Sequence, residues 1–224
     1  YATIELVNPS ILTSLNTAFS CRNTTDSVSP ASRSPSDSPT HKIHANFGWV
    51  IPSGSVVKTG EVLTPMNQRM TMRLPYSMQT GSGSHLGEIG LTYNGFADSY
   101  SWGAQAMFNG SLGKNDEHYE PGNKSQFSAW LAYAFSDAIS TSMRFKYVSS
   151  DAIKGEDSKI NAPVTTANPN NYGADVLDFG IGINTVIAHK HRVAFEYSVP
   201  LKNKVQGVQM EMQNMLTLGY QIAF

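Results

Sequence analysis

This sequence has a single cysteine, no long apolar run and almost no net charge. Cys21 is the single cysteine among 224 residues, which excludes an internal disulfide framework and any metal site built from several cysteines. No run of roughly 18 or more apolar residues occurs, so no transmembrane helix is predicted. Lys and Arg total 16 against 17 Asp and Glu. Without a basic field, no nucleic-acid partner is expected.

What the sequence does contain favours β structure. It has 18 Gly, 10 Tyr and 10 Phe, and its length suits a single domain. The negative mean hydropathy of the chain is compatible with a membrane protein, because every second residue of a barrel strand faces the polar interior. The chain begins at Tyr1 without the regions of a signal peptide. We therefore expect either a removed signal peptide or a fragment.

The end of the chain alternates strictly between apolar and polar residues. One parity holds Met210, Met212, Leu216, Leu218, Tyr220, Ile222 and Phe224, and the other holds Gln209, Glu211, Gln213, Thr217, Gly219 and Gln221. Side chains alternate across a strand, so one face is apolar and the other polar. An edge strand of a soluble β protein is one interpretation. The ending is more typical of the terminal strand of a bacterial outer-membrane β-barrel, with Gly219, Tyr220, Ile222 and Phe224 as a sorting signal for the barrel assembly machinery.

The same alternation recurs from His41 onward and predicts about eight strands. They are expected within residues 43–51, 88–93, 102–109, 126–135, 142–147, 177–184, 192–199 and 209–224. Their connections alternate between short and long, with short turns at 95–99, 136–138 and 188–190, long loops at 52–83, 110–124 and 149–174, and a medium one at 200–208. Short periplasmic turns and longer external loops are typical of outer-membrane barrels. We therefore predict an all-β, antiparallel up-and-down transmembrane β-barrel over residues 41–224, located in the bacterial outer membrane and contacting its lipid.

Residues 1–40 do not follow this pattern. Residues 1–7 and 11–20 suggest a weak hairpin across Asn8-Pro9-Ser10. Residues 21–40 are rich in Ser and Pro and nearly free of large apolar side chains, which predicts a flexible segment.

Three segments resemble a known family. They are Arg73-Leu74-Pro75-Tyr76-Ser77-Met78-Gln79-Thr80-Gly81-Ser82-Gly83-Ser84, Tyr100-Ser101-Trp102-Gly103-Ala104-Gln105 and Leu216-Thr217-Leu218-Gly219-Tyr220. The family is the outer-membrane transporter-like family named for the MetA pathway of phenol degradation, and the resemblance covers residues 41–224. It implies an outer-membrane barrel that passes hydrophobic or aromatic compounds, in a family with no established catalytic residues. Family members carry further amphipathic strands before the position of His41, where this chain departs from the pattern.

One strand parity collects the charged residues that a barrel would direct into its lumen. The lumen-facing set is Glu88, Gln105, Trp130, Arg144, Lys146, Asp178, Arg192, Glu196 and Glu211. With eight strands these side chains would fill the interior, and with twelve or more they would line a water-filled path. Counting from the short turns places Arg144 opposite Trp130, in reach of a cation–π contact, and Glu88 opposite Gln105.

Other candidate sites are weaker. Met66, Met70, Met72 and Met78 share one loop and offer soft thioether ligands for copper, but methionine is also an apolar filler, so no metal or cofactor is predicted. Asp116, Glu117, His118 and Glu120 suggest either a divalent-ion site or a solvated acidic loop. Ser82, Ser84 and His85 lack a partnered Asp or Asn, so no enzyme activity is expected.

These patterns lead to one main functional hypothesis, a passive, porin-like transporter for small hydrophobic or aromatic molecules. The alternatives are a structural or adhesion barrel with a closed lumen and functional external loops, or an outer-membrane protein that handles soft metal ions.

Overall fold

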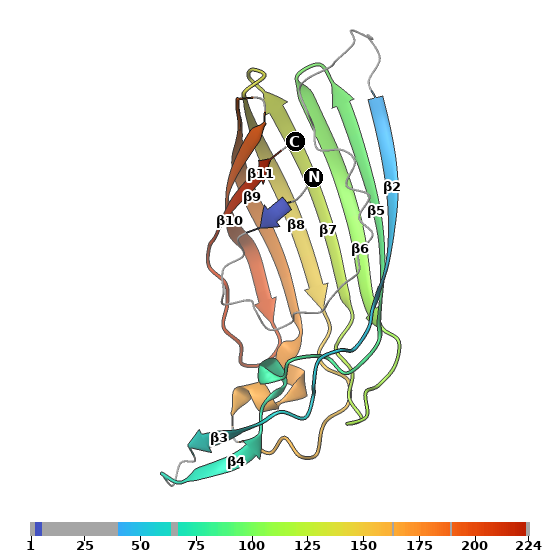
Figure 1. Cartoon of the computed structure of the whole chain (residues 1–224), viewed down its shortest axis with the longest axis vertical. Coiled ribbons are helices and arrows are strands. Elements are labelled where there is room, and N and C mark those ends of the chain that lie inside the picture. The colour runs from blue at the N-terminus through green and yellow to red at the C-terminus, as the bar shows by residue number, and fades with distance from the viewer. Residues whose placement is uncertain (1–2, 6–39, 64–66, 163, 189, 223–224) are drawn as a thin grey trace.

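The computed structural model describes residues 3–5, 40–63, 67–162, 164–188 and 190–222. Its core is one antiparallel sheet in the order β1-β11-β10-β9-β8-β7-β6-β5-β2. The strands are β1 (Thr3–Glu5), β2 (Thr40–Val50), β5 (Leu86–Ala97), β6 (Tyr100–Ser111), β7 (Lys124–Ala134), β8 (Ile139–Ser150), β9 (Ala174–Ile187), β10 (His191–Val205) and β11 (Met215–Ile222). Apart from β1, which pairs with β11, neighbours in the sheet follow one another along the chain, as in an up-and-down barrel (Figure 1).

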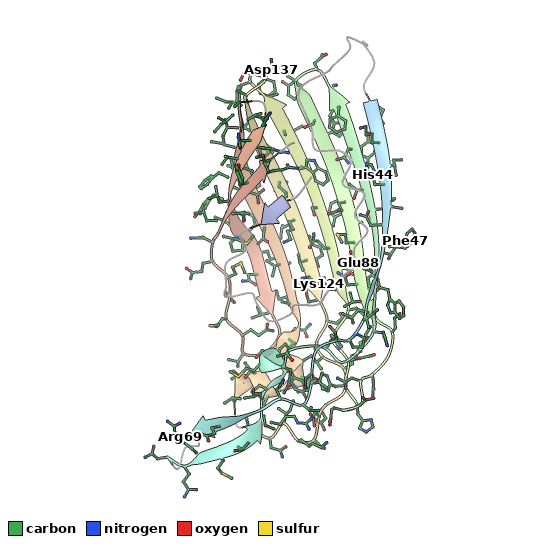
Figure 2. The ribbon with its side chains drawn as sticks, in the orientation of Figure 1. His44, Phe47, Arg69, Glu88, Lys124 and Asp137 are labelled. Atoms are coloured by element: carbon green, nitrogen blue, oxygen red, sulfur yellow. The ribbon has the colours of Figure 1, made fainter. Side chains whose placement is uncertain are left out.

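The two faces of this sheet differ in polarity and in exposure. Phe47 and Ile43 on the apolar face are 78% and 70% exposed, whereas Ser128 and Ser198 on the polar face are 5% and 4% exposed. Figure 2 shows Phe47 projecting away from the sheet at β2. Crowding on the polar face and exposure on the apolar face identify the apolar face as the outside of a curved sheet. A water-soluble protein would bury this apolar surface, so its exposure requires a lipid environment.

The connections separate by length between the two ends of the sheet. The turns after β5, β7 and β9 are short, and the long connections all lie at the opposite end, near the bottom of Figure 1. Asp98 and Ala188 take positive φ values of 44° and 51° in two of the short turns. The predicted alternation of short and long connections is therefore confirmed. No helix among the described residues is long and apolar enough to cross a membrane.

Two strand boundaries differ from the sequence prediction. Strand β10 continues through Pro200 to Val205, with a register shift between Pro200 and Lys202 where a medium connection was expected. A bulge accommodates proline because the missing N–H removes one bond of the ladder. At the other boundary β11 begins only at Met215, so Glu211 lies in the connection before it and not on a strand face.

Of the two cross-strand pairs predicted from the turns, one is correct and one is wrong. Trp130 lies opposite Arg144, as the short turn between β7 and β8 predicted. Glu88, however, lies opposite Asn109, and Gln105 pairs with Thr92. Strand β5 continues to Ala97 and β6 begins at Tyr100, so the turn consists of Asp98 and Ser99 alone and its centre lies later in the chain than that of the predicted turn over residues 95–99. The error is an even number of positions, so it leaves the face of every residue unchanged.

The N-terminal segment contributes one short strand. Strand β1 pairs antiparallel with β11, from Thr3 opposite Gln221 to Glu5 opposite Gly219. The rest of the predicted hairpin, and the Ser- and Pro-rich segment with Cys21, lie outside the described residues. Within the described part of the chain, the only pairing of β2 in this sheet is with β5.

Membrane placement can be tested with two adjacent residues of β5. Leu91 is 56% exposed on the apolar face, and Thr92 lies next to it on the polar face. We expect Leu91→Arg to reduce the free energy of unfolding in lipid vesicles by about 2–4 kcal/mol, because it places a charge against hydrocarbon. Thr92→Arg at the same depth should cost clearly less. Denaturant titration of both variants measures the difference, and equal costs would contradict an outward apolar face.

Candidate functional site

The predicted lumen residues gather on one face of the sheet. Register pairs join them across the strands, including Gln105 with Ser128, Ser128 with Lys146, and Lys146 with Asp178. By the same pairing rule, Glu88, Trp130, Arg144, Arg192 and Glu196 lie on this polar face. Gln105 donates a hydrogen bond from Nε2 to Thr92 Oγ1 at 2.9 Å. The face therefore presents charged and amide groups, with Glu211 as the one predicted member that the strands do not carry.

An ion pair crosses the middle of this face. Arg144 on β8 reaches over β9 and donates a hydrogen bond to Glu196 on β10. The pair spans β9 where Gly180 and Gly182 carry no side chain, and Gly180 lies against the Glu196 carboxylate. The carboxylate, rather than the Trp130 ring that the sequence suggested, is thus the partner of Arg144. The side chains of Arg144 and Glu196 are 34% and 22% exposed, so water reaches both charges.

Trp130 has a different neighbour from the one expected. Its indole lies directly over Gly103 of β6, which is its register partner on the polar face. Any side chain at position 103 would collide with the ring, so the glycine makes this packing possible. The indole is therefore part of the wall of the polar face.

The second candidate site is a cap formed by the long connections, which fold together beyond the sheet. The first connection contains a hairpin, β3 (Thr59–Leu63) and β4 (Arg69–Arg73), and the 3-10 helix η2 (Tyr76–Met78). The third contains η3 (Thr165–Ala167) and η4 (Pro169–Tyr172). Figure 1 shows these elements beneath the sheet, with the hairpin extending to one side. A cap with its own secondary structure was not predicted from the loop sequences.

An aromatic cluster forms the core of the cap. The Tyr76 and Tyr119 rings meet edge to face at 4.8 Å, and Ile160 completes the buried cluster. These three residues come from three different connections, so the cluster ties the connections together. Burial raises the pKa of Tyr119 to about 12, which keeps its hydroxyl protonated. The Tyr76 hydroxyl accepts a hydrogen bond from the backbone N–H of Asp157 at 2.9 Å.

A charged network lies beside this aromatic cluster. Arg73 contacts Asp157 at 2.7 Å and Glu117 at 3.1 Å, and Lys159 also contacts Glu117 at 3.1 Å. The Asp157 side chain is 1% exposed and that of Arg73 is 11% exposed. Hydrogen bonds from Arg73 and then from Lys159 lower the pKa of Glu117. Four charges from three connections therefore hold one another in place.

The segment that carries the family resemblance has a structural role in this cap. Gln79 is 3% exposed, and its side-chain amide donates to the backbone oxygens of Leu74 and Lys58 and accepts from the N–H of Lys58. Gly81 lies against Gly54, so closely that no side chain fits on either residue. The segment thus closes the first connection upon itself, which explains why Gln and Gly occur at these positions.

The structure gives little support to the two weaker candidates for a metal site, the methionines of the first connection and the acidic residues of the second. Among the described residues, no three or more His, Cys, Asp or Glu side chains form a group that could hold a metal ion. Met66 lies outside the described residues, and Met70 and Met78 are 52% and 56% exposed. The solvated acidic loop predicted over residues 116–120 is wrong for Glu117, because its carboxylate is bound to Arg73 and Lys159.

The serines and the histidine at the start of β5 do not form a catalytic pair. Ser82 Oγ donates to the backbone oxygen of Ser84, and Ser84 Oγ is buried without a partner. The ring of His85 lies 5.4 Å from that of Trp49. This geometry gives neither serine a base.

Aromatic and histidine rings gather on the outer face near both ends of the sheet. At the short-turn end, His41 stacks on Tyr93 and His191 stacks on Tyr220, with ring-nitrogen to hydroxyl distances of 2.8 and 2.7 Å. Trp49 occupies the opposite end. Amphipathic rings at these depths suit the headgroup regions of a bilayer.

Comparisons with known proteins agree with this fold. No family model matches the chain, and no curated protein matches its sequence. The COG4313 outer membrane channel from Pseudomonas putida F1 is a structural match with a TM-score of 0.56 and 11% identity, over 82% of this chain and 60% of that one. OmpT, an outer membrane protein of Vibrio cholerae, matches with a TM-score of 0.51 and 12% identity, over 81% and 51% of the two chains. This chain therefore spans between half and three fifths of their length.

At such identities the likeness shows the fold, which is that of an outer-membrane β-barrel. Together with the exposed apolar face and the polar inner face, this fold places the chain in the bacterial outer membrane, in contact with lipid.

The charged network of the cap can be tested at Arg73. Arg73→Gln leaves Asp157 buried without its cationic partner, so we expect the cap to lose about 3 kcal/mol of stability while the sheet is unaffected. Faster hydrogen exchange confined to the three connections, including residues 67–85, 112–123 and 151–162, would report this loss. The control is Arg69→Gln at the hairpin tip, where the Arg69–Glu61 pair is 77% and 67% exposed and should contribute little (Figure 2). Equal exchange in the two variants would contradict the assigned role of Arg73.

A pH dependence follows from Glu117. Its pKa is lowered in the folded cap, so its stabilising contribution is present above the ordinary glutamate value of about 4.3 and is lost as the pH falls through the lowered value. We expect the protection factors of the amides in residues 112–123, which are corrected for the pH dependence of intrinsic exchange, to fall as the pH drops below about 4.3. Glu117→Gln should remove that additional pH dependence, and an unchanged profile would show that another group controls it.

Proposed function

We propose that this chain forms the wall of a passive outer-membrane channel, with the polar face of the sheet lining its lumen. The observation that carries the proposal is the chemistry of that face. Arg144 and Glu196 meet across β9 while still 34% and 22% exposed, and Lys146 lies opposite Asp178. A packed, dry interior would make such charges costly, whereas a hydrated lumen solvates them.

The solutes we propose are small hydrophobic or aromatic molecules. The support comes from the family resemblance of residues 73–84, 100–105 and 216–220, and from the structural match to a protein described as an outer membrane channel. Passage along a lumen with both apolar and charged side chains, such as Trp130 beside Arg144, suits compounds with an aromatic body and a polar substituent.

The cap lies at the end that we assign to the cell exterior. Its aromatic cluster and charged network hold three connections in one arrangement at that end. The same observation favours a second candidate, a structural or adhesion barrel in which the cap is the functional surface and the lumen is closed. The soft-metal alternative has no comparable geometry among the described residues.

Conductance separates the two candidates. We expect the protein in planar bilayers or liposomes to pass small ions and small aromatic compounds such as phenol, and Arg73→Gln to increase the conductance because it loosens the cap. Arg69→Gln should leave the conductance unchanged. If the folded, inserted protein passes neither ions nor phenol, and Arg73→Gln also stays closed, the channel proposal is wrong and the closed barrel is favoured.

A further inference from the structure

A small polar cavity lies on the inner face beside the short turns. It has a volume of about 110 Å³ and is lined by residues of five neighbouring strands, β6 to β10, and of the β7–β8 turn, among them Ser101, Asp137, Ser140, Asn184 and Arg192. Ser140 and Asn184 are register partners, and Ser101 pairs with Ala132, so these side chains belong to the polar face. Figure 2 places Asp137 at this end of the molecule.

Arg192 is the unusual member of this cavity. Its guanidinium makes one long hydrogen bond, 3.4 Å from Asn184 Oδ1, and no carboxylate of the described residues lies within ion-pair distance of it. The other arginine of the inner face, Arg144, has Glu196 as a partner. A guanidinium offers five donors in a planar fork, and the bond to Asn184 uses only one of them.

We infer that this cavity binds the carboxylate group of a small organic anion, with Arg192 as its cationic donor. The planar fork of a guanidinium matches the two oxygens of a carboxylate, and the Ser101 and Ser140 hydroxyls line the same space as further donors. The volume corresponds to roughly three or four water molecules, which suits a carboxylate head group.

A monoanion fits the charges better than a phosphate dianion. Among the described residues that line the cavity, Arg192 is the single cation, and the exposed Asp137 carboxylate opposes a second negative charge. The inference rests on the proposed function in one respect, since the cavity then lies inside the lumen, where it would retain solutes that carry a carboxylate near the short-turn end.

Acetate is the probe that tests the site, because it is a carboxylate head group with a single methyl. Saturation-transfer NMR on the folded protein in detergent should show saturable acetate binding. Loss of charge-assisted hydrogen bonds predicts that Arg192→Gln weakens this binding by roughly ten- to a hundredfold. Arg192→Lys should restore part of it, because the charge returns without the fork.

Lys124→Gln is the matched control, since Lys124 lies on the same face at the opposite end of β7 and loses the same charge (Figure 2). It should bind acetate like the unaltered protein. Absence of saturable binding, or equal affinity in Arg192→Gln and Lys124→Gln, would overturn the inference. Conductance is measured separately: acetate binding without any current would refute the channel alone, and current without acetate binding would refute this site alone.

Discussion

The need to pair every backbone N–H and C=O in a medium without water is the constraint on which this structure depends. In hydrocarbon an unpaired group costs several kcal/mol, so strands must be joined to neighbours on both sides. Strands β5 to β9 meet this requirement along nearly all of their length, whereas β10 pairs with β11 only from His191 to Ser198. Strand β11 is covered on its other edge only by Thr3–Glu5, and β2 pairs only with β5 among the described residues. A chain that spans about three fifths of the matched channel thus shows a sheet with two edges that the complete barrel has to cover.

The same constraint explains how much the sequence could predict. A strand with one face in lipid and one in water must alternate every second residue, and that local signal located eight strands and assigned their faces. Register depends on turn geometry, where one or two residues decide the outcome. The predicted β7–β8 register is correct, whereas the predicted β5–β6 turn lies too early in the chain, and Glu88 is therefore found opposite Asn109 and not opposite Gln105. At Pro200 the bulge has no signal in a rule that counts every second residue.

The cap was beyond prediction for a different reason. Outside the membrane, water satisfies the backbone, so neither alternation nor strand length is required of the connections. Arg73 meets Asp157 across 84 positions of sequence, and Tyr76 meets Tyr119 from another connection. In the sequence, only the family resemblance of residues 73–84 drew attention to one side of these two contacts. The structure shows that Gln79 and Gly81 of this segment serve to fold the loop.

The charges on the inner face follow a pattern that the net charge of the chain conceals. The whole chain carries a formal charge of −1. The strands whose side chains the structure describes nevertheless direct five basic residues toward the polar face, Lys42, Lys124, Arg144, Lys146 and Arg192, against three acidic ones, Glu88, Asp178 and Glu196. In the lumen that we propose, charges on the wall would act on solutes more strongly than charges on an open surface, because the walls of a cleft focus their field. The excess among the described side chains is positive, and no described carboxylate lies within ion-pair distance of Arg192, so the proposed lumen would favour anions over cations of equal size.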